Sequence, residues 1–363
     1  MSDSTSPQPR PNVFDIPPYV AGKPPTPRPG LTSYKLSSNE NPYPPLPGVV
    51  EAANAAVATM NRYPDMGNAG LYDALSARLG VPPTQLAAGT GSVALIYQLL
   101  TAFCDPGAEV VYAWRSFEAY PIAVTTAGAT SVQVPVTADG RHDIPALLAA
   151  VTDRTRVLMV CTPNNPTGPA VTRTELDTLL AGVPPHVVVV VDEAYVEFVR
   201  MDDAIDGLVV QRAHPNVVLF RTFSKAYGLA GFRVGYAVAA PEIAAALRAV
   251  SLPFGISGVA QAAAVASLAV EAALLERVDA LVKERDRVVA GLRKVGWQVP
   301  EPQGNFVWFG LGDRTVEFAA AAEEAGIVVR PFAGDGARVS IGEPEANDRI
   351  IQVAAKFRDA LDG

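Results

Sequence analysis

A single lysine, Lys225, stands where a buried amine would do chemistry. It lies in the stretch RTFSKAYGLAGFRVGY, residues 221–236, just after the apolar run 216–220. Burying an ammonium group is unfavourable unless the group is paired or consumed in a covalent bond. A Schiff base resolves this problem, because the lysine nitrogen is then bound to an aldehyde carbon. The alternative is a solvated lysine in a surface turn, since a Ser-Lys dipeptide alone is a weak signal.

Other polar residues match the needs of an aldehyde cofactor, pyridoxal phosphate. The pyridine nitrogen of this cofactor needs a buried carboxylate, and Asp192 ends the most apolar run in the chain. Its phenolic oxygen needs hydrogen-bond donors, which Asn165 and Tyr195 would supply. Each residue also has a structural alternative: a helix N-cap for Asp192, a turn between two prolines for Asn165 and core packing for Tyr195.

The cofactor phosphate needs backbone amides, hydroxyl groups and an arginine. Gly91 and Ser92 open an apolar helix whose free amide groups would bind an anion, and Ser224 and Arg233 fit the same role. The glycine turn lacks the lysine of a nucleotide-binding P-loop, and an ordinary N-cap is its alternative. For the face of the cofactor ring, the aromatic candidate is Phe117.

An amino-acid substrate adds a carboxylate, which arginine binds with two parallel hydrogen bonds. Arg338 in GARVSIG is the first candidate and Arg330 in VVRPF is the second. A surface ion pair is the alternative for both. Asn41 in the Pro-rich loop at 39–47 would present its amide to a ligand, or would stabilise a turn as asparagine usually does.

Composition and charge exclude several classes of protein. The 363 residues carry a net charge of -8 with a pI near 5.0, which argues against a nucleic-acid or anionic membrane partner. Cys104 and Cys161 cannot form a disulfide framework, and residues 1–30 have no apolar signal core. We therefore expect a cytoplasmic protein. The three histidines are far apart and in no metal-binding spacing, so no metal site is predicted.

The elements that must position these residues alternate between β-rich runs and helices. The β-rich runs lie at 109–113, 131–136, 156–161, 186–191, 217–220 and 234–239. This alternation predicts an α/β fold with a mostly parallel sheet between two layers of helices. Ligands of such folds bind beyond the carboxyl ends of the strands. The segment 162–168, Asp192 and Lys225 all follow strand ends, so we expect them to converge.

The chain is expected to have five parts. Residues 1–30 form a Pro-rich arm, with disorder expected before Pro11; the segment from Phe14 to Val20 is either disordered or crosses to another subunit. The remaining parts are 31–60 as the start of a smaller α+β domain, 61–260 as the large cofactor-binding domain, 261–298 as a connecting helix, and 299–363 as the rest of the smaller domain.

Seven segments in order carry a family resemblance. They read SNENPYPPLP (38–47), RYPD (62–65), GTGS (89–92), TPNNPTG (162–168), DEAYVEF (192–198), RTFSKAYGLAGFRVGY (221–236) and RVSIG (338–342). Together they resemble fold-type I, class II-like aminotransferases, in the branch of histidinol-phosphate and aromatic amino-acid aminotransferases. The resemblance implies a pyridoxal 5'-phosphate enzyme that moves an amino group by ping-pong Schiff-base chemistry.

The resemblance also implies roles for individual residues. Lys225 would bind the cofactor aldehyde, Asp192 its ring nitrogen, and Asn165 and Tyr195 its phenolic oxygen, with Lys225, Asp192 and Tyr195 as the catalytic residues. Arg338 would bind the substrate carboxylate. The protein would be a homodimer. The remaining residues expected at the cofactor or substrate are Gly91, Ser92, Val93, Thr222, Ser224, Arg233 and, from the second subunit, Tyr63 and the Tyr19 region.

One segment favours aromatic substrates. Typical histidinol-phosphate enzymes carry two acidic residues after the glycine turn, where this chain has Val93 and Ala94. The segment WRSFEAYP (114–121), with GSVAL, resembles the actinobacterial aromatic (phenylalanine) branch. We expect transfer from an aromatic L-amino acid to a 2-oxo acid such as 2-oxoglutarate. Histidinol phosphate is the alternative substrate, and a lyase or decarboxylase and a non-catalytic binding module are alternative functions.

Overall fold

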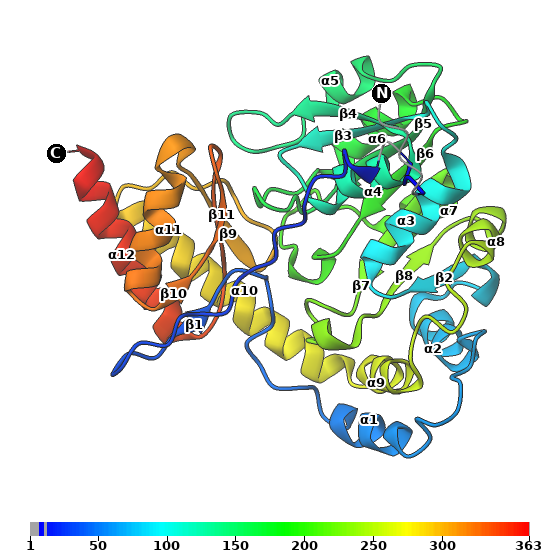
Figure 1. Cartoon of the computed structure of the whole chain (residues 1–363), viewed down its shortest axis with the longest axis horizontal. Helices are drawn as coiled ribbons and strands as arrows, with labels where there is room; N and C mark the ends of the chain where they lie inside the picture. The colour runs from blue at the N-terminus through cyan, green and yellow to red at the C-terminus, as the bar shows by residue number, and fades with distance from the viewer. Residues whose placement is uncertain (1–6, 11–12, 363) are drawn as a thin grey trace.

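A seven-stranded sheet forms the centre of the larger of two lobes in the computed structural model, which describes residues 7–10 and 13–362 (Figure 1). Its strand order is β2-β8-β7-β6-β5-β3-β4. All neighbouring pairs from β4 to β7 are parallel, whereas β8 is antiparallel to both β7 and β2. The sheet is therefore mostly parallel, as predicted. The strands are β2 (Leu86–Gly89), β3 (Glu109–Trp114), β4 (Thr130–Pro135), β5 (Thr155–Cys161), β6 (Val188–Asp192), β7 (Val217–Thr222) and β8 (Gly235–Val238).

Helices cover both faces of this sheet. On β6, Val188 and Val190 pack toward one apolar cluster and Val189 and Val191 toward the other. Both faces are buried, which explains why the sequence of this strand is apolar throughout rather than alternating. One layer contains α3 (Ser92–Phe103), α4 (Ala119–Ala127) and α8 (Pro241–Ala249), and the other contains α5 (Ile144–Ala149), α6 (Arg173–Gly182) and α7 (Gly207–Ala213).

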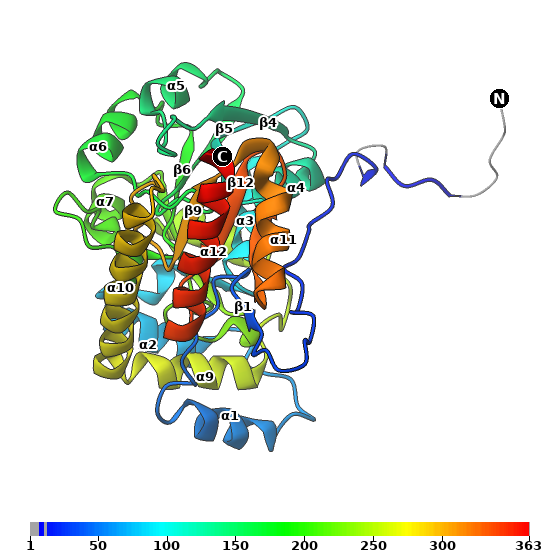
Figure 2. The same ribbon diagram turned by 90° about the vertical axis from the view of Figure 1, so that its left-hand side faces the viewer.

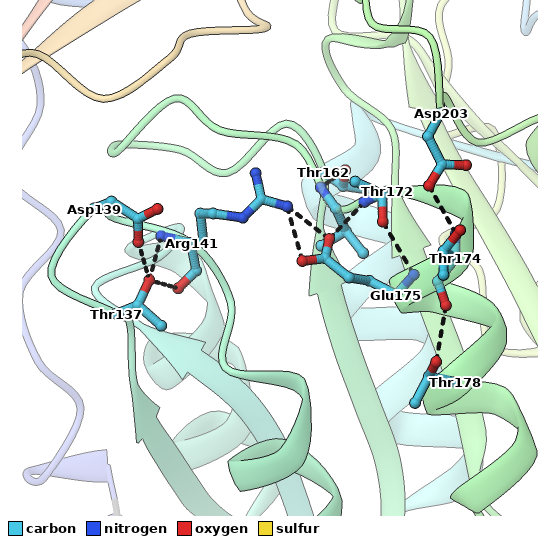
Figure 3. Close-up of polar contacts among 10 residues, drawn as sticks. Thr137, Asp139, Arg141, Thr162, Thr172, Thr174, Glu175, Thr178 and Asp203 are labelled. Carbon is cyan, nitrogen blue, oxygen red and sulfur yellow. Dashed lines mark hydrogen bonds and ion pairs between the residues drawn. The ribbon is translucent and has the colours of Figure 1, made fainter.

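Helix α6 begins at a capping box that an arginine ties to the loop after β4 (Figure 3). The backbone N–H of Glu175 donates to Oγ1 of Thr172 at 3.0 Å, and the backbone N–H of Thr172 donates to the Glu175 carboxylate at 2.7 Å. Arg141 donates to both oxygens of that carboxylate, at 2.9 and 2.7 Å. Oγ1 of Thr162 accepts a hydrogen bond from the backbone N–H of Val171 at 2.9 Å. This bond and the capping box hold the two ends of the segment that carries Asn165.

The smaller lobe combines β1, from the amino-terminal part of the chain, with the carboxy-terminal elements β9 to α12 (Figure 2). Strand β1 (Tyr34–Lys35) pairs in parallel with β10 (Ile327–Val328), and an antiparallel sheet has the order β11-β12-β9. The other elements of this lobe are β9 (Phe306–Gly310), β11 (Arg330–Phe332), β12 (Gly336–Ser340), α11 (Thr315–Glu324), α12 (Pro344–Asp362) and the 3₁₀ helix η5 (Gly312–Arg314). The remaining elements of the described chain are α1 (Val49–Val57), α2 (Ala69–Leu79), α9 (Gly258–Leu268), α10 (Glu271–Lys294) and the 3₁₀ helices η2 (Pro83–Gln85), η3 (Val196–Phe198) and η4 (Ala230–Phe232).

The single connecting helix expected within 261–298 is wrong in one respect, because this part of the chain forms two helices, α9 and α10. Helices α9 and α10 meet at an angle of 82°. Val270 at the break has φ -121° and ψ 46°, outside the helical region, and it packs against the core. Within the described residues no single helix is long and apolar enough to cross a membrane; the α9–α10 pair meets the length and composition criteria only when both helices are counted together.

The amino-terminal arm runs past the boundary between the lobes. The disorder expected before Pro11 falls in part on residues 1–6, which lie outside the described residues, as do 11–12. Phe14, Tyr19 and Val20 expose apolar surface on this chain. At Gly22 the arm passes so close to the main body that a Cβ would lie 2.5 Å from Oγ of Ser37.

Candidate active site

One cavity of about 260 Å³ lies beyond the carboxyl ends of β5, β6 and β7. It brings together most of the residues that the sequence predicted. These lining residues are Tyr19, Ser92, Val93, Phe117, Asn165, Asp192, Tyr195, Thr222, Ser224, Lys225, Arg233, Arg330 and Arg338. Tyr19 was expected from a second subunit but lines the cavity of its own chain.

Asp192 is a buried carboxyl group with one oxygen left over. Only 3% of the residue is exposed. Oδ2 accepts a hydrogen bond from the hydroxyl of Tyr120 at 2.8 Å, whereas Oδ1 has no hydrogen-bond partner among the described residues. Burial raises the pKa of Asp192 to about 6. A cation beside Oδ1 would offset the free-energy cost of burying the ionised carboxylate, and a protonated pyridine nitrogen has the required charge.

Lys225 is positioned for proton transfer at neutral pH. Its Nζ donates to the carbonyl oxygen of Ser38 at 3.0 Å. Burial, together with the nearby guanidinium groups of Arg338 and Arg233, lowers the pKa of Lys225 to about 7. Such an amine is largely uncharged just above neutral pH, which is the form that attacks an aldehyde or accepts a proton.

Arg338 crosses from the smaller lobe to the cavity. Its Nη1 donates to Oδ1 of Asn165 at 2.5 Å and its Nη2 to the carbonyl oxygen of Ser37 at 2.6 Å. Its Nε is buried without a hydrogen-bond partner in the described part of the chain. Tyr195 lies nearby, and its hydroxyl accepts from Nδ2 of Asn39 at 2.9 Å. Arg338 therefore has a free N–H group with which to bind an anion. The two oxygens that hold its guanidinium belong to different parts of the chain, Asn165 and Ser37.

A cradle for a phosphate group forms where α3 begins. Helix α3 starts at Ser92, so the amide groups of its first turn are not used by intrahelical hydrogen bonds. Gly91 has φ 78°, and a Cβ there would lie 2.5 Å from Nη2 of Arg233. Arg233 also donates to Oγ of Ser224 at 3.3 Å, and Oγ1 of Thr222 donates to the same oxygen at 3.0 Å. Glycine at 91 is thus required both by the backbone conformation and by the arginine.

These residues fit pyridoxal phosphate as a set. The cradle offers amides, hydroxyl groups and an arginine to a phosphate. Lys225 offers an amine to the aldehyde, and Asp192 has a free oxygen for the ring nitrogen. Phe117 lines the same cavity and offers an aromatic face. No group of three or more potential metal ligands occurs within residues 7–10 and 13–362.

Three of the predicted residues lie outside the cavity lining: Gly91, which belongs to the phosphate cradle, Asn41 and Tyr63. Nδ2 of Asn41 donates to the carbonyl oxygens of Lys225 and Ala226, at 3.4 and 2.9 Å, so it holds the backbone that carries the lysine. Tyr63 is 83% exposed and stacks on Phe254, with ring centroids 4.6 Å apart. Its proposed contact with a cofactor would have to be made in another subunit.

The structure adds residues that sequence reasoning missed. Tyr120 on α4 bonds to Asp192, and Glu118 and Phe332 line the cavity. The segment WRSFEAYP contained the signal for the first two, because it places a carboxylate and a tyrosine beside Phe117, which was already a candidate for the cofactor ring. Phe332 gave no such signal, since its position depends on how β11 packs against the larger lobe.

Comparison with known proteins agrees with this geometry. A family model described as aminotransferase class I and II matches residues 33–353. A protein named aromatic amino acid aminotransferase from Streptomyces avermitilis is 58% identical over 98% of this chain and 99% of its own length. A protein of the same name from Streptomyces coelicolor is 56% identical over the same shares.

Among solved structures, the crystal structure of histidinol-phosphate aminotransferase from Sinorhizobium meliloti in complex with pyridoxal-5'-phosphate superimposes with a TM-score of 0.83. It is 29% identical to this chain, and the match covers 91% of this chain and 92% of that one. The predicted α/β aminotransferase fold and the family resemblance are confirmed. This chain therefore belongs to the class I and II aminotransferase family, whose cofactor is pyridoxal 5'-phosphate.

Proposed function

We propose that this aminotransferase moves the amino group of an aromatic L-amino acid to a 2-oxo acid such as 2-oxoglutarate. The observation that carries the proposal is the cavity that holds Lys225, Asp192 and Arg338 together with the apolar side chains Val93 and Phe117. The high identity to proteins named aromatic amino acid aminotransferase supports it. Histidinol phosphate is the second candidate substrate, because the Sinorhizobium meliloti structure bears that name.

The cofactor, when bound, supplies an aldehyde that takes up the amino group and a ring that accepts electrons. Gly91, Ser92, Ser224 and Arg233 would hold its phosphate. Asp192 would pair with its ring nitrogen and keep that nitrogen protonated. The protonated nitrogen would in turn give Oδ1 of Asp192 the positively charged partner that it lacks among the described residues.

The substrate is positioned by its carboxylate and reacts at its α-carbon. Arg338 binds the carboxylate with a guanidinium that Asn165 and Ser37 hold in place. Lys225 would remove the α-proton as a general base and, as a general acid, would deliver it to the former aldehyde carbon of the cofactor, since its pKa of about 7 suits both roles. The same residues act again when the 2-oxo acid accepts the amino group.

The substrate assignment is tested by half-reactions. The cofactor-loaded enzyme is mixed separately with phenylalanine, tyrosine, tryptophan and histidinol phosphate, without an acceptor, and the cofactor absorbance is followed. We expect fast changes with the aromatic amino acids. A fast change with histidinol phosphate and none with phenylalanine would reverse the assignment. Formation of a 2-oxo acid that strictly requires an amino acceptor distinguishes transamination from a lyase or decarboxylase.

A homodimer with shared active sites is part of this proposal. Exposed apolar side chains gather near the α1–α2 connection and the loop after α8, which is the surface a second copy would cover. They are Met60, Tyr63, Met66, Leu252 and Phe254. Cys104 and Cys161 are free thiols, which is consistent with the cytoplasmic location expected from the sequence.

Subunit mixing tests whether the second copy donates Tyr63. We expect Tyr63→Ala and Lys225→Ala to be nearly inactive alone, but active when the two variants are unfolded and refolded together. One site of the mixed dimer then has an intact Lys225 and receives an intact Tyr63 from the other subunit. If Tyr63 served its own subunit, mixing would restore nothing.

A further inference from the structure

An ion pair forms part of the cavity wall. Arg330 on β11 donates from Nη2 to both carboxylate oxygens of Glu118, at 2.9 and 2.7 Å. Glu118 immediately precedes α4, so the pair joins the two lobes. The side chains are 8% and 25% exposed, and both residues line the cavity. A charge-assisted pair that is this well shielded from water is held more firmly than a surface pair.

Two of the three arginines that line the cavity, Arg338 and Arg330, differ in what neutralises them. Arg338 has neutral partners, an amide oxygen and a carbonyl oxygen, and its Nε has no partner among the residues described. Arg330 is instead neutralised by the carboxylate of Glu118, to which its Nη2 donates. With Arg233 assigned to the cofactor phosphate, the cavity presents one guanidinium without an acidic partner, that of Arg338, which suits the one carboxylate that every amino-acid substrate has.

The surroundings of the ion pair are also charge-balanced. The ring of Phe332 has the guanidinium of Arg330 at 5.2 Å and that of Arg115 at 5.5 Å. Arg115 is paired with Asp335 at 2.5 Å. Both arginines around this aromatic ring thus have acidic partners, so this wall combines an apolar surface with no net charge.

We propose that Glu118 is a specificity-determining residue: by pairing with Arg330, it prevents this arginine from binding an anionic substrate side chain. A phosphate or carboxylate on the substrate side chain would have to displace Glu118 and would face its negative charge, whereas an aryl group makes no such demand. The more negative charge a substrate side chain carries, the more weakly the pocket should bind it. A 2-oxo dicarboxylate should therefore bind, but less tightly than an acid with an aryl side chain. This inference rests on the proposed function, since it concerns the side-chain pocket of that reaction.

Binding of unreactive acids tests the proposal without catalysis. Hydrocinnamate, glutarate and 3-phosphonopropionate share one carboxylate and differ in the charge of the other end. Their dissociation constants are measured by calorimetry on the cofactor-loaded wild type, on Glu118→Gln and on the control Glu40→Gln, at a pH where the phosphonate is a dianion. Glu40 is the matched control because it lines the same cavity but pairs with Lys35.

We expect Glu118→Gln to tighten 3-phosphonopropionate about tenfold and glutarate about threefold, and to change hydrocinnamate by less than about twofold. Glu40→Gln should leave the order of the three acids as in wild type. Equal effects of both substitutions, or no change in Glu118→Gln, would overturn the proposal. Unchanged melting temperature and cofactor absorbance in each variant exclude misfolding as the cause.

The half-reaction with phenylalanine separates this inference from the function on which it rests. Wild type that fails to react with phenylalanine refutes the proposed function. Wild type that reacts with phenylalanine, combined with an unchanged acid preference in Glu118→Gln, refutes only the role of Glu118.

Discussion

Replacing Asp192 with asparagine measures what it costs the cofactor-free fold to bury this carboxylate. Burial raises the pKa of Asp192 from its ordinary value of 3.8 to about 6, even though Tyr120 donates a hydrogen bond to it. That rise is equivalent to destabilising the ionised fold by about 3 kcal/mol. Asparagine keeps the shape and the acceptor for Tyr120 but removes the charge.

The sign of the effect follows from linkage. Below pH 3.8 the carboxyl group is neutral in the folded and unfolded states. Between pH 3.8 and about 6 only the unfolded chain is ionised, so wild type loses stability as the pH rises. Above about 6 both states are ionised and the loss is constant. Relative to wild type, the free energy of unfolding of Asp192→Asn should therefore rise by about 2.4 kcal/mol between pH 4 and pH 7.

Urea denaturation of both cofactor-free proteins at several pH values measures this difference. A constant cost of burying the asparagine amide does not affect the pH dependence of the difference in free energy of unfolding. The other titrating groups occur in both proteins, so their contributions cancel. Saturating pyridoxal phosphate should reverse the order, since only the carboxylate pairs with a protonated ring nitrogen. A difference that does not change with pH, or equal stabilisation of both proteins by the cofactor, would refute the reasoning.

Three further substitutions test single contacts. Tyr120→Phe removes a buried hydrogen bond to Asp192 and should weaken cofactor binding about tenfold, measured by titration of the cofactor-free protein. Gly91→Ala would place a Cβ 2.5 Å from Nη2 of Arg233 at φ 78°, so cofactor affinity should fall while the fold, followed by circular dichroism, persists. Arg338→Lys loses bidentate carboxylate binding and should raise the KM for phenylalanine at least about tenfold, with a smaller change in kcat.

Sequence reasoning predicted the residues that follow strand ends because the parallel sheet brings those ends to one edge. Asp192 and Lys225 follow apolar runs that became the adjacent strands β6 and β7. Asn165 follows β5, the strand on the other side of β6. Their convergence needed only the order of strands and the rule for parallel sheets.

Contacts between lobes could not be predicted in the same way. Glu118 and Arg330 lie 212 residues apart, and their pairing depends on how β11 meets the start of α4. Arg330 was expected to bind the substrate carboxylate or to form a surface ion pair. In the structure it instead pairs with Glu118 in the wall of the cavity. The break at Val270 was missed because alanine-rich sequence on both sides favours helix, and only packing against the core sets the 82° angle.

Borohydride reduction of the cofactor-loaded enzyme, followed by peptide mass mapping, tests the central claim most directly. The reduction fixes a Schiff-base cofactor to the amine that holds it. We predict the added mass on the peptide that contains Lys225, with none in Lys225→Ala and loss of the label in wild type pre-treated with phenylalanine. Label on any other lysine of native enzyme, or label at Lys225 that phenylalanine does not remove, would contradict the account.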